Sequence, residues 1–218
     1  MNRYEGFIFD LNGTMVNDMH YHETAWYDVF VNKLKAPLTL EQVRQQLYGK
    51  ADEIFDRIFG AGRFGKDEIE RITLEKEARY REEFLPHLKL IDGLDIVLGK
   101  AKSVGISLAI GTAAPVLNVE FVLDNLGLRH YFPIIIGPDD VAESKPHPEV
   151  FLKAAGQLGI LPEHCIVFED SPRGIEAAAR AGMKAIAITS YHAADELKNK
   201  NVLFAIEDYR DARLDPLF

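Results

Sequence analysis

Short, continuous runs of apolar residues recur along the chain, and the segments between them have the length of helices. Apolar runs bounded by polar turns are typical of strands that are buried on both faces of a parallel sheet. The runs lie at residues 4–9, 106–110, 133–136, 165–168 and 185–189, with 202–206 as an edge strand. Helix-length segments lie at 93–103, 116–126, 148–158 and 174–181. This alternation predicts βαβ crossovers and an α/β, Rossmann-like, doubly wound parallel sheet.

The stretch between the first two predicted strands shows no strand pattern and is helical throughout. Its predicted helices are 19–34, 40–47, 51–59 and 66–84. In the first of them His22, Trp26, Val29, Phe30 and Lys33 share one face at helical spacing. An insert at this point lies near the carboxyl ends of the strands, where open α/β sheets bind ligands. We therefore predict a core domain of residues 1–17 and 86–218 and an all-α cap domain of residues 18–85, which opens and closes over a cleft.

The composition narrows the range of partners. The 218 residues are 47% hydrophobic, which is enough for a packed core, and the formal net charge is -9. An acidic chain without a basic run is not attracted to nucleic acid or to anionic membranes. A single cysteine, Cys165, excludes an internal disulfide, and the sequence shows neither a signal peptide nor an apolar stretch of membrane-spanning length. We expect a cytoplasmic, monomeric protein that binds neither nucleic acid nor membrane.

Residues able to do chemistry follow the predicted strands. Asp10 ends the first strand in FIFDLNGT, and Thr112 follows the second strand in AIGTAA. Lys145 precedes a helix in ESKPHPEVF, and Glu169 and Asp170 end the fourth strand in VFEDSPRG. Each has a structural alternative as a turn, loop or helix-capping residue. Because parallel strands end at one edge of a sheet, the set predicts a carboxylate nucleophile, a hydroxyl donor, a cation and an acidic pair in one place.

These motifs resemble those of the haloacid dehalogenase superfamily, in particular the β-phosphoglucomutase-like phosphatases with a helical cap after the first strand. The resemblance covers nearly the whole chain. It implies that Asp10 forms an aspartyl-phosphate, that the cofactor is Mg²⁺, and that the substrate is a small phosphorylated metabolite such as a sugar phosphate. Anionic attack on a phosphate monoester requires shielding by cations and by hydrogen-bond donors, which fits this set.

The resemblance also assigns individual residues. It implies phosphate binding by Thr112, Ala113 and Lys145, and metal binding by Asp10, the backbone carbonyl of Asn12, Glu169 and Asp170. His22 of YHETAW resembles the histidine beside the nucleophile in the mutase-like members. Gly49 and Lys50 of LYGKADEIFDRIF resemble the substrate-binding stretch of the cap.

The sequence departs from the family at position 12. The family has an aspartate there, two residues after the nucleophile, which protonates the leaving group and then activates water. Asn12 does neither, because an amide neither donates nor accepts a proton readily at neutral pH. Three interpretations stay open: an introduced substitution, a different base such as His22, or a protein that binds phosphate without turning it over.

A second departure lies in the cap. Asp52 occupies the position where the mutases have an arginine for the distal phosphate, and Tyr48 replaces a lysine. A carboxylate there repels a second phosphate, although Lys50 can compensate. The sequence therefore favours a phosphatase over a bisphosphate-using sugar-phosphate mutase.

Overall fold

The computed structural model describes residues 4–218, which form two compact units. The core unit consists of the chain up to Asn17 together with Lys89–Phe218, and the helical unit is Asp18–Leu88. The sequence placed the second border at residue 85, and the helical unit extends three residues beyond it. No helix within the described part of the chain is both long and apolar enough to cross a membrane.

The core unit contains a six-stranded sheet in the order β3-β2-β1-β4-β5-β6, and every neighbouring pair is parallel. The strands are β1 (Gly6–Phe9), β2 (Ser107–Gly111), β3 (Ile134–Ile136), β4 (Cys165–Glu169), β5 (Lys184–Ile188) and β6 (Val202–Ile206). All six predicted strands are present, and β6 is the predicted edge. The predicted α/β fold class is confirmed.

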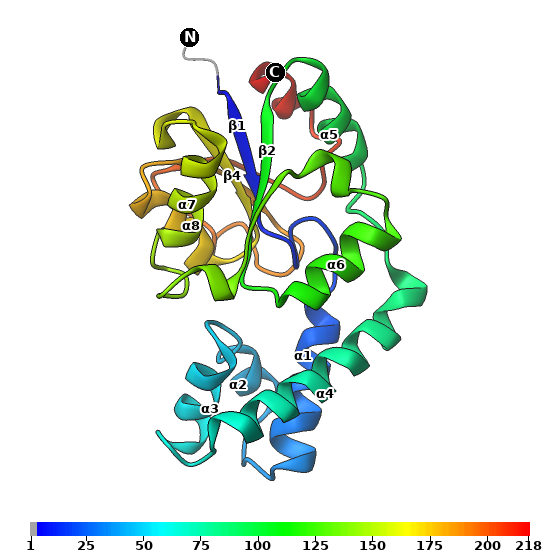
Figure 1. The fold of residues 1–218 in the computed structure, drawn as a ribbon, viewed down its shortest axis with the longest axis vertical. Helices are drawn as coiled ribbons and strands as arrows, with labels where there is room; N and C mark the ends of the chain where they lie inside the picture. The colour runs from blue at the N-terminus through cyan, green and yellow to red at the C-terminus, as the bar shows by residue number, and fades with distance from the viewer. Residues whose placement is uncertain (1–3) are drawn as a thin grey trace. The chain divides into compact units, whose positions relative to one another are not determined.

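Successive side chains of β1, a central strand, point to opposite faces of the sheet. Phe7 and Phe9 of β1 lie on one face, where the Phe9 ring stacks on Phe168 with 4.4 Å between centroids. Ile8 faces the other side, in a buried cluster that includes Phe151 of α7 (Glu149–Leu158) and Ile175 of α8 (Pro172–Arg180). Figure 1 shows α7 and α8 on one side of the sheet and α5 (Leu94–Ser103) on the other. The sheet is therefore buried on both faces, as its continuous apolar strands predict.

Cys165 lies at the start of β4 and is fully buried. Burial raises the pKa of its thiol to about 11. The thiol is therefore protonated at neutral pH and packs as a small apolar group.

The helices of the core unit agree with the prediction except at one start. α6 spans Val116–Asn125, and the short 3-10 helices are η3 (Arg129–Tyr131), η4 (Pro138–Asp140), η5 (Pro162–His164) and η6 (Ala212–Leu217). α8 begins at Pro172 rather than near Gly174, so the predicted start was wrong by two residues. The reason is local: Ser171 caps the helix by accepting a hydrogen bond from the Gly174 N–H at 3.0 Å, and proline suits the first helical position.

The helical unit contains no strand anywhere in Asp18–Leu88. Its elements are α1 (Met19–Tyr27), η1 (Asp28–Lys33), α2 (Leu40–Arg44), α3 (Ala51–Phe59), α4 (Lys66–Phe84) and the 3-10 helix η2 (Leu85–His87). A small apolar core holds them together. Trp26 stacks on Phe30 with 4.8 Å between centroids, and Phe55 meets Phe30 edge-on.

The predicted helix 19–34 changes geometry after Tyr27. η1 is a π-helix, in which the Leu34 N–H donates to the carbonyl of Val29 at 2.9 Å. The wider turn rotates the residues that follow, so Lys33 is exposed and pairs with Glu75 at 2.8 Å. The prediction that Lys33 shares the buried face with Trp26 and Phe30 is therefore wrong.

Candidate active site

The carboxyl ends of three neighbouring strands bring Asp10, Thr112 and Glu169 to one edge of the sheet. Asp10 follows β1 directly, and its N–H donates to the carbonyl of Phe168 in β4 at 3.0 Å. Thr112 follows β2, and Glu169 is the last residue of β4. Because β1 lies between β2 and β4, these side chains emerge from adjacent strands.

Lys145 joins this group from the turn that precedes α7. Its Nζ lies 2.6 Å from Asp10 Oδ1 and 2.8 Å from Glu169 Oε1. All three side chains are at most 10% exposed, so the two ion pairs are poorly screened by water. The structure thus brings together three of the predicted site residues through direct contacts.

Burial strongly perturbs the carboxylates of this cluster. It raises the pKa of Asp10 to about 6, against the opposing effect of Lys145. It also raises the pKa of Asp170 well above its usual range, and the nearby charges of Glu169 and Asp10 add to the effect. Burial works against the charge on Lys145, but Asp10 and Glu169 outweigh it and raise the pKa of the lysine. Burial therefore disfavours the ionised form of these carboxyl groups, and the charge of Lys145 opposes this effect.

Glu169 is fixed by the start of α8. Glu169 Oε2 accepts one hydrogen bond from the Ser171 N–H at 2.7 Å and another from the Ser171 hydroxyl at 2.9 Å. A Cβ on Gly174 would lie 1.7 Å from Oε1 of this carboxylate. The absence of a side chain at Gly174 is therefore what allows this carboxylate to lie against the helix, with Oε2 bonded to Ser171 and Oε1 bonded to Lys145.

Thr112 follows β2, which flanks β1 on the side away from β4. Its hydroxyl bonds to the Asp10 carboxyl and favours the charged form, which lowers the pKa of Asp10. The hydroxyl oxygen also accepts from the N–H of Ala114 at 3.0 Å. Thr112 is buried, whereas Ala113 beside it is exposed. Both belong to the turn between β2 and α6, where the resemblance places the phosphate.

Asn12 belongs to the tight loop that follows Asp10. It is half-buried and forms an isolated parallel bridge with Val16. Within the same loop the Thr14 hydroxyl donates to Asp170 Oδ1 at 3.1 Å. A hydrogen bond thus joins the loop after β1 to the Asp170 carboxylate that follows β4.

A comparison with protein families finds one that matches most of the chain. The family described as haloacid dehalogenase-like hydrolase matches residues 7–188, a range that contains all the residues of the cluster. The chain belongs to the haloacid dehalogenase-like hydrolases.

Named relatives within this family are phosphatases and mutases. The chain is 33% identical over 186 residues to the fructose-1-phosphate phosphatase YqaB of Escherichia coli, covering 84% of this chain and 96% of the relative. A family IA, variant 3 hydrolase from Entamoeba histolytica has a TM-score of 0.85 at 28% identity, covering 98% and 97% of the two chains. The β-phosphoglucomutase of Clostridium difficile has a TM-score of 0.84 at 25% identity, covering 98% and 95%. The predicted hydrolase of haloacid dehalogenase type is confirmed.

The donor atoms of this hydrolase fit a magnesium ion. When ionised, three buried carboxylates surround one ammonium, which leaves two negative charges for a divalent cation to balance. No group of three or more acidic, histidine or cysteine side chains across residues 4–218 has the arrangement of a metal centre by itself. Mg²⁺ does not need one, because it commonly binds through one or two carboxylates and keeps several waters.

Both oxygens of Glu169 already have partners in Lys145 and Ser171. Asp10 and Asp170 are therefore the carboxylates suited to direct coordination, together with the Asn12 carbonyl. A metal contact of Glu169 fits best through water. In the structure its direct role is to hold Lys145.

The hydrolase's His22 lies in a network of buried charged groups within the helical unit. Its Nδ1 is 2.6 Å from Lys76 Nζ, and its ring stacks on Tyr80 with 3.9 Å between centroids. Lys76 also donates to Glu77 at 2.9 Å, and the Tyr80 hydroxyl donates to Asp18 at 2.5 Å. Because an ammonium group can only donate, Nδ1 is the acceptor of this hydrogen bond when Lys76 carries its charge.

The predicted cap residues Gly49 and Lys50 lie just before α3. The Lys50 N–H donates to Glu53 Oε2 at 3.0 Å, and Gly49 has a φ of 81°. Asp52 bonds locally, since its Oδ1 accepts from the Glu53 N–H at 3.0 Å. Two acidic residues thus lie beside the single charge of Lys50 in this turn.

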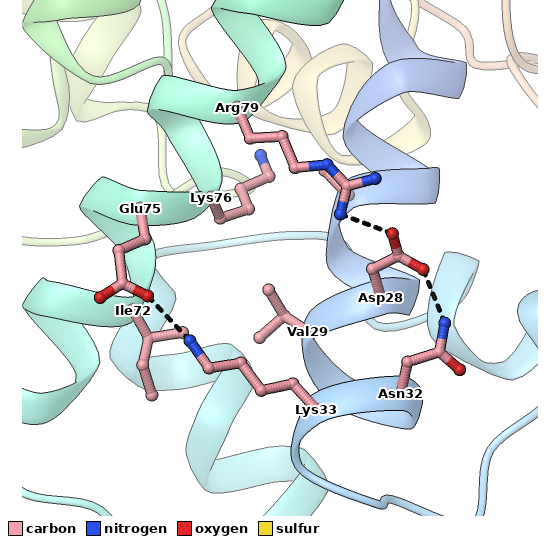
Figure 2. Close-up of a pocket in the computed structure, with 9 residues that line it drawn as sticks. Asp28, Val29, Asn32, Lys33, Ile72, Glu75, Lys76 and Arg79 are labelled. Carbon is pink, nitrogen blue, oxygen red and sulfur yellow. Dashed lines mark hydrogen bonds and ion pairs between the residues drawn. The ribbon is translucent and has the colours of Figure 1, made fainter.

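A pocket of about 450 Å³ lies within the helical unit, between α4 and the segment formed by α1 and η1 (Figure 2). Ala25, Val29 and Ile72 form its apolar part. Two ion pairs cross it, Lys33 with Glu75 at 2.8 Å and Arg79 with Asp28 at 2.6 Å. None of the predicted site residues lines this pocket.

Sequence reasoning missed the residues that hold the cluster in place. Thr14, Ser171 and Gly174 lie inside the recognised motifs, and the S-P-x-G pattern after Asp170 is a helix-start signal that could have indicated two of them. The hydroxyls of Ser190 and Tyr209 donate to the carbonyls of Gly13 and Thr14 in the loop after β1. These two residues lie outside every motif, and no local signal marks them.

Proposed function

We propose that the protein is a Mg²⁺-dependent phosphatase that hydrolyses a small phosphorylated metabolite, a sugar phosphate, through an aspartyl-phosphate on Asp10. The observation that carries the proposal is the buried Asp10–Lys145–Glu169 group beside Asp170. A nucleophilic carboxylate next to a cation, a hydroxyl donor and excess negative charge suits phosphoryl transfer. Sequence similarity to a fructose-1-phosphate phosphatase supports the sugar phosphate.

The chemistry divides into two displacements. A carboxylate oxygen of Asp10 forms a bond to phosphorus while the ester P–O bond breaks, and the leaving alkoxide takes a proton. Water then attacks the phosphorus of the acyl phosphate, which releases inorganic phosphate and restores Asp10. Lys145 and Thr112 stabilise the charge on the transferred group, and a bound Mg²⁺ supplies further electrostatic shielding.

The proposed site lacks an efficient group for proton transfer to the leaving group and from water. Asn12 cannot give a proton to the alkoxide or take one from water. His22 is a poor substitute, because its Nδ1 already accepts from Lys76. Burial lowers the pKa of Lys76, but Glu77 beside it favours the charged form. We infer that the leaving group obtains its proton from water and that turnover is slow with poor leaving groups.

Two rival functions follow from particular residues. Asn12 favours a protein that binds phosphate without turning it over, and tight phosphate binding without product formation would support it. The likeness to β-phosphoglucomutase favours a mutase, although Asp52 and Glu53 near Lys50 oppose a second phosphate. Activation of the enzyme by a sugar bisphosphate would identify a mutase.

The test is a screen of phosphorylated sugars and other small phosphate esters with Mg²⁺, read as released inorganic phosphate. The wild-type chain, Asn12→Asp and Asp10→Asn are assayed in parallel. We expect hydrolysis by the first two proteins and none by the third. Equal release by Asp10→Asn and wild type would refute the aspartyl-phosphate.

A further inference from the structure

Three successive carbonyls in the loop after β1 each accept a hydrogen bond from a different, distant segment. The donors are the Ser190 hydroxyl to Gly13, the Tyr209 hydroxyl to Thr14 at 2.9 Å, and the Ile91 N–H to Met15 at 2.9 Å. This loop contains Asp10 and Asn12, which the proposed function makes the nucleophile and a metal ligand. Its backbone is therefore fixed from outside at every residue between Gly13 and Met15.

The bond from Tyr209 differs from the other two because it leads directly to a metal-ligand candidate. Tyr209 bonds to the carbonyl of Thr14, and the hydroxyl of the same Thr14 donates to Asp170 Oδ1 at 3.1 Å. All three residues are at most 3% exposed. A displacement of Thr14 would therefore change both the loop after β1 and the orientation of Asp170, and both bonds lie away from bulk solvent.

Tyr209 is suited to be a permanent donor. Burial raises the pKa of its phenol well above the usual 10, and the charges of Asp170 and Asp10 raise it further. The phenol therefore keeps its proton at every working pH. Its ring lies against Phe168 and Phe9, with centroids 5.8 and 6.3 Å away. These contacts hold the hydroxyl in one place.

The backbone of Tyr209 is fixed as well. Its N–H donates to the carbonyl of Asp92 at 2.9 Å. Gly93, with a φ of 85°, allows this approach, because a Cβ there would lie 2.9 Å from the Tyr209 carbonyl carbon. The segment that carries Tyr209 thus packs directly on the start of α5.

We propose that Tyr209 is a positioning residue for the phosphoryl-transfer site: through Thr14 it fixes the loop that carries Asp10 and Asn12 and orients Asp170 for Mg²⁺. The inference rests on the proposed function for its catalytic meaning. Tyr209 lies outside residues 7–188, the range that matches the family. The C-terminal segment is therefore part of the site's support rather than a cover for the sheet edge.

Tyr209→Phe tests the proposal, because it removes one oxygen and keeps the packed ring. Residues that orient metal ligands typically change metal affinity by about 10- to 100-fold. We expect Mg²⁺ affinity, measured by calorimetry on the full chain, to fall by about tenfold, toward the lower end of that range because Tyr209 acts through Thr14. At saturating Mg²⁺, kcat should fall while KM stays close to the wild-type value, since the substrate contacts are unchanged.

Hydrogen exchange gives a readout that needs neither metal nor substrate. In the metal-free protein the amides of residues 14–16, which donate to the carbonyl of Leu11, should exchange faster in Tyr209→Phe. Tyr131→Phe is the matched control. It removes a hydroxyl from another core-unit tyrosine, whose ring packs on Lys102, and should leave all three measurements unchanged.

The outcomes separate the two proposals. Wild-type Mg²⁺ affinity and wild-type exchange in Tyr209→Phe would overturn the positioning role, and so would a lower thermal midpoint with both unchanged. Faster exchange with weaker Mg²⁺ binding, in a chain whose wild type hydrolyses no phosphate ester, would uphold the positioning role and reject the proposed function. If the wild type binds no Mg²⁺, the exchange measurement alone decides.

Discussion

Asn12 has an amide at the position where the resemblance implies a carboxyl group, two residues after Asp10, which our proposal makes the nucleophile. We expect Asn12→Asp to raise kcat by roughly 10² to 10⁴, the usual contribution of a positioned acid or base. This corresponds to about 2.7 to 5.4 kcal/mol of transition-state stabilisation. Poor leaving groups, such as sugar alkoxides, should gain more than aryl phosphates, because they need the proton more. Steady-state kinetics on both ester types measures the difference.

His22 provides the control for this prediction. Since its Nδ1 accepts from Lys76, His22→Ala should lower kcat far less than Asp10→Asn does. Loss of all activity in His22→Ala, together with no gain in Asn12→Asp, would mean that the histidine is the base and that its contact with Lys76 does not prevent proton transfer.

The buried carboxylates predict how pH affects the stability of the metal-free protein. Folding raises the pKa of Asp10 from 3.8 to about 6 and that of Asp170 well above 3.8, so both favour the folded state most when protonated. Their contribution is present below pH 3.8 and is lost as pH rises through the folded-state values. Without metal, Asp170→Asn should therefore gain thermal stability over wild type as pH rises from 4 to 7.5, on the order of a few kcal/mol at most.

Magnesium should reverse this order. At 100 times its Kd, Mg²⁺ stabilises a protein by about 2.7 kcal/mol, which raises the midpoint of a chain of this size by about 5 to 10 °C. We expect that shift in the wild type at pH 7.5, a smaller shift at pH 5, and almost none in Asp170→Asn. Differential scanning calorimetry measures all three. Equal shifts in both proteins would contradict Asp170 as a ligand.

Among the elements, α8 does more than cover the sheet, because its first turn holds Glu169. We expect Gly174→Ala to displace this carboxylate, since the new Cβ would lie 1.7 Å from Oε1. Lys145 would then lose one of its two partners. The variant should lose roughly tenfold or more in kcat and about 1 to 3 kcal/mol of stability, the cost of leaving a buried charged group without its partner.

Gly156 offers a matched control in α7. A Cβ there meets nothing within 4 Å, and the position is helical. Gly156→Ala should therefore stabilise the protein by about 0.5 to 1 kcal/mol without changing kcat. If both variants behaved alike in thermal unfolding and kinetics, the steric role of Gly174 would be wrong.

The elements also show what a single sequence can and cannot predict. The meeting of Asp10, Thr112 and Glu169 was predictable because parallel strands end at one edge, so strand ends far apart in the chain meet. Lys145 lies in the turn before α7, and its motif rather than a strand end indicated it. The π-helix after Tyr27 was not, because hydrophobic spacing does not resolve one extra residue in a turn.

The supporting contacts were also beyond reach. Tyr209 bonds to Thr14 across 195 positions, and Lys76 reaches His22 across 54. No local sequence pattern predicts such pairs, because each residue by itself looks like an ordinary core or helix residue. The convergence of the candidate site residues was therefore predictable, and the contacts that hold them in place were not.

At the scale of the whole molecule, the chain leaves and re-enters the core unit at neighbouring points. Val16 and Leu90 form an antiparallel bridge, just before Asn17 and just after Lys89. We expect that replacing residues 18–88 by a short glycine linker leaves a folded core. Its Mg²⁺ affinity should stay within about threefold of wild type, because all the candidate ligands belong to the core unit.

Calorimetric titration and thermal unfolding of this shortened chain provide the measurements. The same deletion carrying Asp170→Asn is the control and should bind Mg²⁺ weakly. A shortened chain that folds but fails to bind the metal would show that the helical unit contributes to the metal site.

The bridge between Val16 and Leu90 also has an evolutionary meaning. It ties the two ends of the insertion together within the core unit, so the loop after β1 and the segment before α5 are joined independently of the residues between them. We expect that the inserted segment can change in sequence and length while the loop that contains Asp10 keeps its place in the core unit.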